Sequence, residues 1–472
     1  MKTIQICDVM SNSGVAFGTS GARGLVSAMT DEVCAAYAAA FLAVTRRSFS
    51  FDRVALGMDL RPSSPRIVAA CTAALQDQGI TVDFCGALPT PALALYAQDE
   101  AIPAIMVTGS HIPFDRNGIK FYRPDGEISK ADEQAIAAAV VELEHTHCEL
   151  PEVNPAALAH YVQRYLAFFP MQCFKGLRLG VYQHSSVARD VLVSILEGLG
   201  AEVTPLGRTA DFVPIDTEAV AEVDVQRGSD WAAQYGFDAI ISTDGDGDRP
   251  LISDEHGAWL RGDIVGLITA HYLGADKVVV PVSCNTAIEL CGAFDSVTRT
   301  RIGSPYVIAG MEVAGTGAVI GFEANGGFLM GSSVSRNGRT LDALPTRDAV
   351  LPALAVLAAA SERGGKVSGL LADLPARFTA SDRLQEFPVA TSRQLLERLT
   401  GDPQAVQDIL APDAARAVST DVTDGLRITF DNGEIVHLRP SGNAPELRCY
   451  CEAASEARAK LLVATVLARL RS

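Results

Sequence analysis

Apolar segments follow one scheme three times along the first three quarters of the chain. In the first copy, a strand and a polar turn at residues 54–65 lead into a helix, and a second strand follows at 80–85. The second copy has the same order, with a strand and turn at 177–187, a helix to Gly200 and a strand that ends at Gly207. Short apolar runs bounded by Gly, Ser and Pro are typical of buried strands.

Each copy also has an apolar strand that leads directly into a polar loop. These strands begin at Ala104, Ala239 and Ala318, the last in a third copy that starts at Lys277. The repeat predicts three similar α/β domains with mixed sheets. Because ligands of α/β sheets bind outside the carboxyl ends of the strands, we expect the three loops to converge on one cleft.

The last hundred residues have a different pattern. After helix-type segments, two strands at 426–430 and 434–438 flank the turn Asp431-Asn432-Gly433. A strand at 447–452 and a helix from Ala454 follow. This order predicts a C-terminal α+β domain beside the three α/β domains.

With 472 residues, the chain is too long for one hydrophobic core. The pair Gly364-Gly365 is a candidate linker before the last domain. The expected domains are residues 1–155, 156–256, 257–368 and 369–472.

Composition fits a globular enzyme and argues against two kinds of partner. Hydrophobic residues make up 48% of the chain and charged residues 20%. The net charge of −17 argues against nucleic acid and against an anionic membrane surface. The sequence has no apolar run of the roughly 18 residues that a membrane span needs. Acidic and polar residues also come too early at the N-terminus for a signal peptide.

The ten cysteines predict a reducing compartment, most simply the cytoplasm. They are scattered and form no C-x-x-C pair or zinc-type spacing with histidine. Cys449 and Cys451 lie two apart in a predicted strand, and we expect them to pack together rather than to form a disulfide. The sequence gives no sign of an obligate protein partner.

The first polar loop, T-G-S-H-I-P-F-D-R-N-G-I-K-F-Y, places Ser110 beside His111, and Lys120 follows a predicted turn at Asn117-Gly118. A hydroxyl, an imidazole and an ammonium group on one segment can carry out group transfer on an anion. The alternative is a polar loop in which the Ser and His bond to their own backbone.

The second polar loop, D-G-D-G-D-R, contains the most specific motif. Asp244, Asp246 and Asp248 are separated only by glycines, so their carboxylates can surround one hard cation such as Mg²⁺. The alternative is an EF-hand loop that ends at Glu255. However, Arg249 occupies the position where an EF-hand needs Gly, and a strand precedes the motif.

Three further segments offer groups for a sugar or a phosphate. Arg23 lies in the Gly-rich loop F-G-T-S-G-A-R-G, whose alternative is a tight surface turn. Glu323 and Asn325 lie between glycines in G-F-E-A-N-G-G and could bond to sugar hydroxyls, although the acid could equally lie at a loop tip. Gly303, in R-I-G-S-P-Y, belongs to a less specific loop.

A turn near the C-terminus, L-R-P-S-G-N-A-P, offers a guanidinium fork, a hydroxyl, an amide and backbone N–H groups for phosphate. The alternative is an ordinary polar hairpin. The candidate residues are Arg439, Ser441, Gly442 and Asn443.

Together and in this order, these motifs resemble the α-D-phosphohexomutase family over essentially the whole chain, in particular its phosphomannomutase and phosphoglucomutase group. The resemblance implies three similar α/β domains and an α+β domain around a cleft. It also implies a phosphoserine at Ser110, sugar binding by residues 321–327 and phosphate binding by residues 439–443. The implied Mg²⁺ ligands are Ser110, Asp244, Asp246 and Asp248, and the implied charged residues at the reacting centre are Arg23, His111, Lys120 and Arg249.

The implied activity is an isomerase that interconverts mannose 6-phosphate and mannose 1-phosphate. It would use a phosphoserine enzyme, a hexose 1,6-bisphosphate as intermediate or activator, and one Mg²⁺ per chain. Phosphoglucomutase and phosphoglucosamine mutase are the alternatives within the family. A metal-dependent sugar phosphatase and a non-catalytic sugar-phosphate-binding protein are the alternatives outside it.

The chain departs from the family pattern at several loop positions. Ile112 replaces the Asn that usually follows the His, Asn325 stands where Ser is common, and Gly327 stands where many members have His. Asn443 and Ala444 replace the usual Thr and Glu. The missing His leaves the second general acid or base unassigned.

Overall fold

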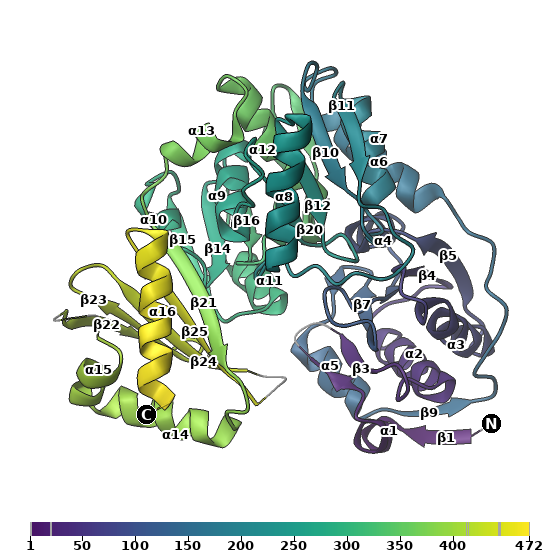
Figure 1. Cartoon of the computed structure of the whole chain (residues 1–472). Coiled ribbons are helices and arrows are strands. Elements are labelled where there is room, and N and C mark those ends of the chain that lie inside the picture. The colour runs from purple at the N-terminus through teal and green to yellow at the C-terminus, as the bar shows by residue number, and fades with distance from the viewer. Residues whose placement is uncertain (1, 19–20, 412, 414, 442–444, 472) are drawn as a thin grey trace.

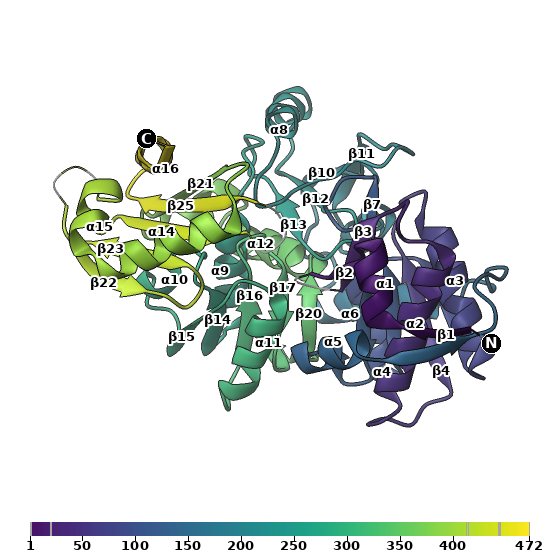
Figure 2. The same cartoon turned by 90° about the horizontal axis from the view of Figure 1, so that it is seen from below.

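The computed structural model describes residues 2–18, 21–411, 413, 415–441 and 445–471. Four units follow one another along an arc, with the N-terminal and C-terminal units at its two ends (Figure 1). The view of Figure 2 shows the same separation of these two units. This architecture, three α/β units followed by an α+β unit, confirms the predicted fold class.

The first unit is built on a mixed sheet in the order β2-β3-β7-β6-β4-β5, with β8 beside β7. Its helices include α2, which begins where Thr30 Oγ1 accepts the Val33 N–H at 3.3 Å and where acidic residues occupy the first turn. The strands are β1 (Lys2–Gln5), β2 (Ala16–Phe17), β3 (Ala22–Leu25), β4 (Arg53–Met58), β5 (Thr81–Ala87), β6 (Ala104–Val107), β7 (Arg116–Arg123), β8 (Gly126–Glu127) and β9 (Val140–Leu143). The helices are α1 (Ile6–Ser13), α2 (Asp31–Thr45), α3 (Ser64–Asp77), α4 (Thr90–Asp99) and α5 (Lys130–Ala137).

The second unit has a sheet in the order β11-β10-β12-β13. Its elements are α6 (Ala156–Phe168), β10 (Arg178–Tyr182), α7 (Arg189–Gly198), β11 (Glu202–Leu206), α8 (Glu222–Tyr235), β12 (Ala239–Thr243) and β13 (Pro250–Ile252).

The third unit has a sheet in the order β15-β14-β16-β17-β20 and a small hairpin, β18-β19. Its strands are β14 (Lys277–Pro281), β15 (Ser296–Thr300), β16 (Val319–Phe322), β17 (Phe328–Met330), β18 (Val334–Arg336), β19 (Arg339–Leu341) and β20 (Leu344–Asp348). Its helices are α9 (Gly262–Leu273), α10 (Ala287–Leu290), α11 (Ser304–Val313), α12 (Val350–Glu362) and α13 (Val367–Ala372).

Strand order confirms the threefold repeat. The orders β5-β4-β6-β7, β11-β10-β12-β13 and β15-β14-β16-β17 correspond strand by strand. In each, the first two pairs are parallel and the last pair is antiparallel. The loops β6–β7, β12–β13 and β16–β17 are therefore equivalent, and they carry Ser110, the three aspartates and Glu323.

The C-terminal unit is an antiparallel sheet in the order β21-β25-β24-β23-β22 with three helices. The turn at residues 431–433 and its two flanking strands are present as predicted, whereas β21 and β22 were not foreseen. The elements are β21 (Phe378–Leu384), α14 (Val389–Gly401), α15 (Pro403–Ile409), β22 (Ala417–Asp421), β23 (Leu426–Phe430), β24 (Ile435–Pro440), β25 (Leu447–Ala453) and α16 (Glu456–Arg471).

The hydrophobic cores do not follow the units one to one. One large core joins the second and third units and includes α4 and part of β6 from the first unit. The first unit has a further core around α2 and α3, and the C-terminal unit has a core of its own. In this last core, Cys449 and Cys451 are buried with free thiols 3.7 Å apart, which agrees with packing rather than a disulfide.

One local expectation needs correction. Asn117 and Gly118 lie within β7 rather than in a turn. A Cβ at Gly118 would lie 2.8 Å from the Thr108 carbonyl oxygen and 2.9 Å from that of Ala22, so the glycine permits close packing of neighbouring strands.

The candidate linker Gly364-Gly365 directly follows α12, and residue 368 lies within α13, which packs against α12. We therefore propose that the last domain boundary lies between α13 and β21. The other predicted boundaries stay predictions. Among the described residues, no helix is both long enough and apolar enough to cross a bilayer.

Candidate active site

The β6–β7 loop brings Ser110 to the acidic β12–β13 loop. Ser110 is buried, and its Oγ donates a hydrogen bond to Asp244 Oδ2 at 2.5 Å, although the two residues lie 134 positions apart. The Ser110 N–H donates to Thr108 Oγ1 at 2.8 Å. Ser110 also has a φ of 51°, which is uncommon for a residue other than glycine and costs conformational energy. The fold therefore holds this hydroxyl against a local preference.

Arg61, which the sequence analysis did not single out, supports this loop. Its buried guanidinium pairs with Asp59 at 3.1 Å and stacks over the Phe212 ring at 3.9 Å. Its position just beyond the carboxyl end of β4, at the same sheet edge as Ser110, was the signal that could have identified it. It also donates to the backbone carbonyls of Ser110, Ile112, Pro113 and Arg116.

The three aspartates form a compact, fully buried cluster. One carboxylate oxygen from each of Asp244, Asp246 and Asp248 lies within 4.8 Å of the others. The cluster lies between two antiparallel strands, and Glu255 accepts hydrogen bonds from Ser368 instead of facing the cluster. The EF-hand alternative is therefore wrong.

Cations and a hydroxyl hold two of these carboxylates. Lys120 Nζ donates to Asp246 Oδ2 at 2.6 Å and to Asp248 Oδ2 at 2.7 Å, and Thr90 Oγ1 donates to Asp246 Oδ2 at 2.7 Å. Arg347 binds Asp248 Oδ2 from β20, with its Nη2 at 2.8 Å. Sequence reasoning missed both Thr90 and Arg347.

The charges around the cluster divide the carboxyl groups into two kinds. Burial would raise the pKa of Asp246 and Asp248, but Lys120, together with Arg347 at Asp248, brings both below their ordinary value. Burial and the two neighbouring carboxylates raise the pKa of Asp244 well above its ordinary value. Ionisation of Asp244 therefore requires a further positive charge beside Ser110.

The residues present fit a hard divalent cation. Asp246 Oδ1 and Asp248 Oδ1 are buried and have no hydrogen-bond partner among the described residues. Buried oxygens that accept no hydrogen bond are costly unless an ion or water occupies the space next to them. Carboxylates in this number, with a hydroxyl beside them, match the ligands that Mg²⁺ prefers.

A cluster of cations adjoins the aspartates. Arg249 Nη1 donates to His111 Nδ1 at 2.9 Å, and the charge of Arg249 together with burial lowers the pKa of His111 to about 2. Burial and the charges of Arg249 and Arg347 lower the pKa of Arg23 to about 10. Several buried cations so close together repel one another, and an anion such as phosphate would relieve this repulsion.

The β16–β17 loop carries the candidate sugar-binding residues to the same place. Glu323 Oε2 accepts a hydrogen bond from Arg347 Nη1 at 3.3 Å. Asn325 Oδ1 accepts the Gly327 N–H at 2.9 Å, and its carbonyl accepts a hydrogen bond from Thr217 of the second unit at 2.7 Å. Glu323 is therefore linked through one guanidinium to the acidic cluster.

Arg439, from the candidate phosphate-binding turn near the C-terminus, lies where the third and C-terminal units meet. Arg439 pairs with Asp424 at 3.0 Å, and the same carboxylate accepts the Ile302 N–H at 2.9 Å, next to Gly303. Ser441 is buried, and its N–H donates to the Glu446 carbonyl at 2.8 Å. Gly442 and Asn443 lie outside the described residues.

A cavity of about 580 Å³ lies between the second and C-terminal units. Its walls include Asp216 and Glu218 on one side and Arg383, Arg448 and Tyr450 on the other. Asp216 acts electrostatically on His111, which places this cavity beside the reacting centre. None of the described residues of the three loops is among the residues that line it.

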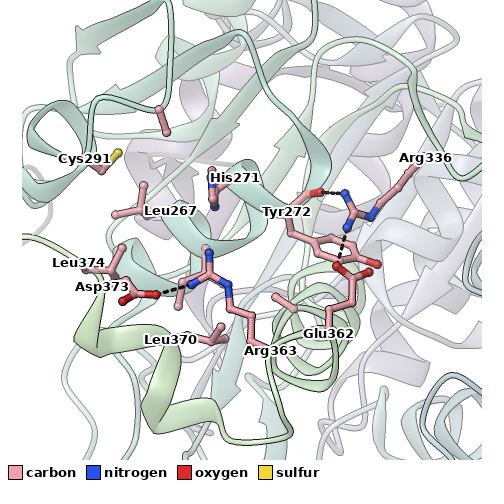
Figure 3. A pocket seen from close by; sticks show the side chains of 13 residues that line it. Leu267, His271, Tyr272, Cys291, Arg336, Glu362, Arg363, Leu370, Asp373 and Leu374 are labelled. Carbon is pink, nitrogen blue, oxygen red and sulfur yellow. Dashed lines mark hydrogen bonds and ion pairs between the residues drawn. The ribbon is translucent and has the colours of Figure 1, made fainter.

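A second hollow, of about 430 Å³, lies in the third unit between α9, α12 and α13 (Figure 3). Leucines form part of its wall, and the ion pairs Arg363–Asp373 and Arg336–Glu362 lie at its edge. None of the predicted site residues that the structure describes lines it.

Comparison with known proteins gives consistent matches along the chain. Four family models match, all described as phosphoglucomutase/phosphomannomutase. They are alpha/beta/alpha domain I over residues 14–147, domain II over 159–257, domain III over 261–378 and the C-terminal domain over 392–469.

Relatives and solved structures match at full length. A phosphomannomutase of Salmonella muenchen is 51% identical, with 98% of this chain and 97% of the relative covered. A phosphomannomutase of Sinorhizobium fredii (strain NBRC 101917 / NGR234) is 47% identical, with 97% and 99% covered. A solved phosphoglucomutase/phosphomannomutase family protein from Burkholderia thailandensis has a TM-score of 0.74 at 20% identity, with 96% of both chains covered.

Proposed function

Because this chain belongs to the phosphoglucomutase/phosphomannomutase family, we propose that it interconverts mannose 6-phosphate and mannose 1-phosphate. The reaction is an isomerisation by phosphoryl transfer through a phosphoserine enzyme and a hexose 1,6-bisphosphate. The observation that carries the proposal is the buried contact between Ser110 Oγ and Asp244 at 2.5 Å, surrounded by cations. The names of the two similar full-length relatives support mannose as the sugar.

Ser110 carries the phosphoryl group in this scheme. The bond between phosphorus and Ser110 Oγ breaks, a bond to the free hydroxyl of the hexose monophosphate forms, and the hydroxyl proton ends on Ser110. The bisphosphate then reorients and returns its other phosphoryl group to Ser110. Phosphoryl transfer has a loose transition state, so the protein contributes mainly positioning and charge neutralisation. Lys120, Arg23 and Arg249 provide the positive charge.

The acidic cluster is the proposed Mg²⁺ site. Asp244, Asp246, Asp248 and the Ser110 oxygen would hold the ion, and the buried oxygens of Asp246 and Asp248 that accept no hydrogen bond among the described residues support this assignment. When bound, Mg²⁺ neutralises negative charge on the transferring phosphoryl group. Hexose 1,6-bisphosphate, the intermediate, would also act as activator by phosphorylating free Ser110.

The resemblance suggests that His111 shuttles the hydroxyl proton, with an orienting role as the alternative, and the contacts of His111 favour the orienting role. Its lowered pKa keeps the ring neutral, and Nδ1 already accepts a hydrogen bond from Arg249. Ser110 Oγ lies 3.3 Å from the same nitrogen. Proton acceptance at Nδ1 would therefore break the contact that holds Arg249 in place.

The hexose phosphate is the proposed partner of the remaining residues. Glu323 and Asn325 would bond to sugar hydroxyls, with Gly303 beside them. The phosphate that does not react would bind to Arg439 and Ser441. Gly442 and Asn443 are also expected to contribute, on the basis of the sequence. Holding either end of the sugar in this way lets one site serve both half-reactions.

The test compares Ser110→Ala with Ser335→Ala, an exposed serine of β18. Mass spectrometry should find a phosphorylated peptide containing Ser110, and Ser110→Ala should reduce kcat by roughly 10⁴-fold or more while Ser335→Ala has no effect. Full activity of Ser110→Ala with added bisphosphate would refute the scheme.

A paired assay with mannose 1-phosphate and glucose 1-phosphate tests the choice of sugar. We expect a higher kcat/KM for the mannose substrate. A higher value for glucose would favour the phosphoglucomutase alternative, and an assay with glucosamine 1-phosphate would test the third family activity. Release of inorganic phosphate without isomerisation would favour the phosphatase alternative.

A further inference from the structure

Gly327 has a backbone conformation that other residues adopt, but it has no space for a side chain. Its φ lies outside the left-handed range. A Cβ at this position would lie 2.6 Å from Arg347 Cδ and 2.9 Å from Arg347 Cγ. The stem of Arg347 therefore fills the volume that a side chain at position 327 would occupy.

The head of Arg347 connects two loops of the site. Its Nε and Nη2 lie 3.0 and 2.8 Å from Asp248 Oδ2, and its Nη1 donates to Glu323 Oε2 at 3.3 Å. All three side chains are at most 5% exposed. One guanidinium thus joins a carboxylate of the proposed metal site to the carboxylate of the proposed sugar-binding loop.

The end of β20 is itself fixed by three units. Thr346 donates to Glu127 of the first unit at 2.9 Å. Asp348 accepts hydrogen bonds from Tyr161 and Tyr165 of the second unit, and it also accepts the N–H of Val350, the first residue of α12 in the third. Because side chains alternate along a strand, these two residues point to the opposite side from Arg347. The position of Arg347 is therefore fixed by residues that do not belong to the site.

We propose that Arg347 is a positioning residue that takes the place of the side chain absent at position 327 and sets Glu323 relative to Asp248. This inference rests on the proposed function. Sugar binding then depends on Arg347 through Glu323, although Arg347 need not contact the substrate. Many family members have a His at position 327, which could act as a second acid or base. Arg347 and such a side chain cannot share that volume, so the presence of Arg347 goes together with the loss of the His.

The planar fork of arginine is essential to this role. Lysine at position 347 would keep the charge next to Asp248 but would supply one flexible ammonium group instead of separate donors for two carboxylates. Arg347→Lys should therefore release Glu323 while leaving the acidic cluster neutralised. Arg336→Lys, in the hollow of Figure 3, is the matched control, because Arg336 also spans two partners but lies outside the site.

The first experiment measures equilibrium binding in the Ser110→Ala background, where turnover is blocked. Arg347→Lys should weaken mannose 1-phosphate binding roughly tenfold by calorimetry, about 1.4 kcal/mol. It should leave Mn²⁺ affinity, measured by paramagnetic resonance on the sugar-free protein, within about threefold. Unchanged sugar affinity, or a parallel loss of Mn²⁺ and sugar binding, would overturn the proposal.

The second experiment is a double-mutant cycle between positions 327 and 347. Gly327→Ala should lower the melting temperature when Arg347 is present, because the new methyl group collides with the arginine stem. In Arg347→Ala, the same methyl group enters an emptied volume and should not lower the melting temperature. Equal effects in both backgrounds would show that the two residues do not compete for space. This cycle remains informative if mannose 1-phosphate proves not to bind, which would count against the proposed substrate instead.

Discussion

The two ends of the proposed site are held in different ways. Around Ser110, the first three units share a hydrophobic core, and buried charged groups cross their boundaries, as in the pairs Lys120–Asp246 and Arg347–Asp248. Around Arg439, the C-terminal unit has its own core and meets the third unit through polar contacts. The surroundings of Ser110 therefore belong to one continuous core, whereas the proposed phosphate-binding residues around Arg439 (the far-end grip) lie on a unit with a separate core.

Most contacts that attach the C-terminal unit cluster near β21. Glu452 accepts hydrogen bonds from Thr286, and Arg377 pairs with the same carboxylate at 2.5 Å. Asn285 Nδ2 donates to the Arg377 carbonyl at 2.9 Å. The separate contact between Asp424 and Ile302 lies at the far-end grip. A small polar junction of this kind permits relative motion of the two units.

This difference matches the chemistry of the two ends. Phosphoryl transfer gains most from charges that are already in place when the reaction begins, which requires a rigid surrounding. The far phosphate must instead be bound, released during reorientation and bound again. A grip on a movable unit can open for this step and then close to exclude water.

The largest expected effect is that of Lys120→Met. The substitution leaves Asp246 and Asp248 buried without the ammonium that both share, so kcat should fall roughly 10³-fold. In melting experiments, Mg²⁺ should raise the melting temperature of the variant more than that of the wild type, because the ion then replaces the missing cation. Lys277→Met, at the start of β14, is the control. A loss of activity no larger than that of Arg439→Ala, described below, would contradict the contrast between the two ends of the proposed site.

How much of this arrangement the sequence could predict depends on how local each signal is. Ser110 and the three aspartates lie in contiguous motifs, and the repeat places their loops at equivalent positions. Arg61 follows β4 and Arg347 lies within β20, and neither belongs to a recognisable motif. The position of Arg61 after a strand is only a weak signal, and tertiary packing alone brings Arg347 to the site. Asn117-Gly118 has the composition of a turn, yet packing between strands decides its structure.

An intermediate effect is expected for Arg439→Ala. If Arg439 binds the phosphate that does not react, as proposed, the variant loses a charge-assisted contact, so KM for both mannose phosphates should rise roughly 10- to 100-fold. Because Arg439 also pairs with Asp424 at 3.0 Å, the melting temperature should fall as well, and KM is measured well below it. Arg398→Ala, an exposed residue of α14 in the same unit, should leave KM unchanged. A fall in kcat with unchanged KM would place Arg439 at the reacting centre instead.

The smallest effect is expected from a lower pH. It should distinguish the joined first three units from the C-terminal unit by their resistance to unfolding. Burial is the main cause that lowers the pKa of His184 in the second unit and of His437 in β24 to about 4. The unfolded chain, with a histidine pKa near 6.5, binds a proton that the folded chain excludes. The free energy of unfolding is therefore undiminished above about pH 6.5 and falls as the pH decreases towards 4. At pH 5 each histidine lowers it by about 2 kcal/mol.

The same loss of unfolding free energy should open the C-terminal unit before it opens the second unit. His184 lies in a unit that shares its core with two others, whereas His437 lies in a unit that depends on its own smaller core. Hydrogen exchange at pH 5, corrected for the intrinsic rate, should therefore show lost protection first in β23 and β24, while β10 and β12 remain protected. His437→Phe should restore protection in the C-terminal unit at this pH. If β10 opened together with β24, the two regions would form a single cooperative unit, and the C-terminal grip would not be free to move during the reaction.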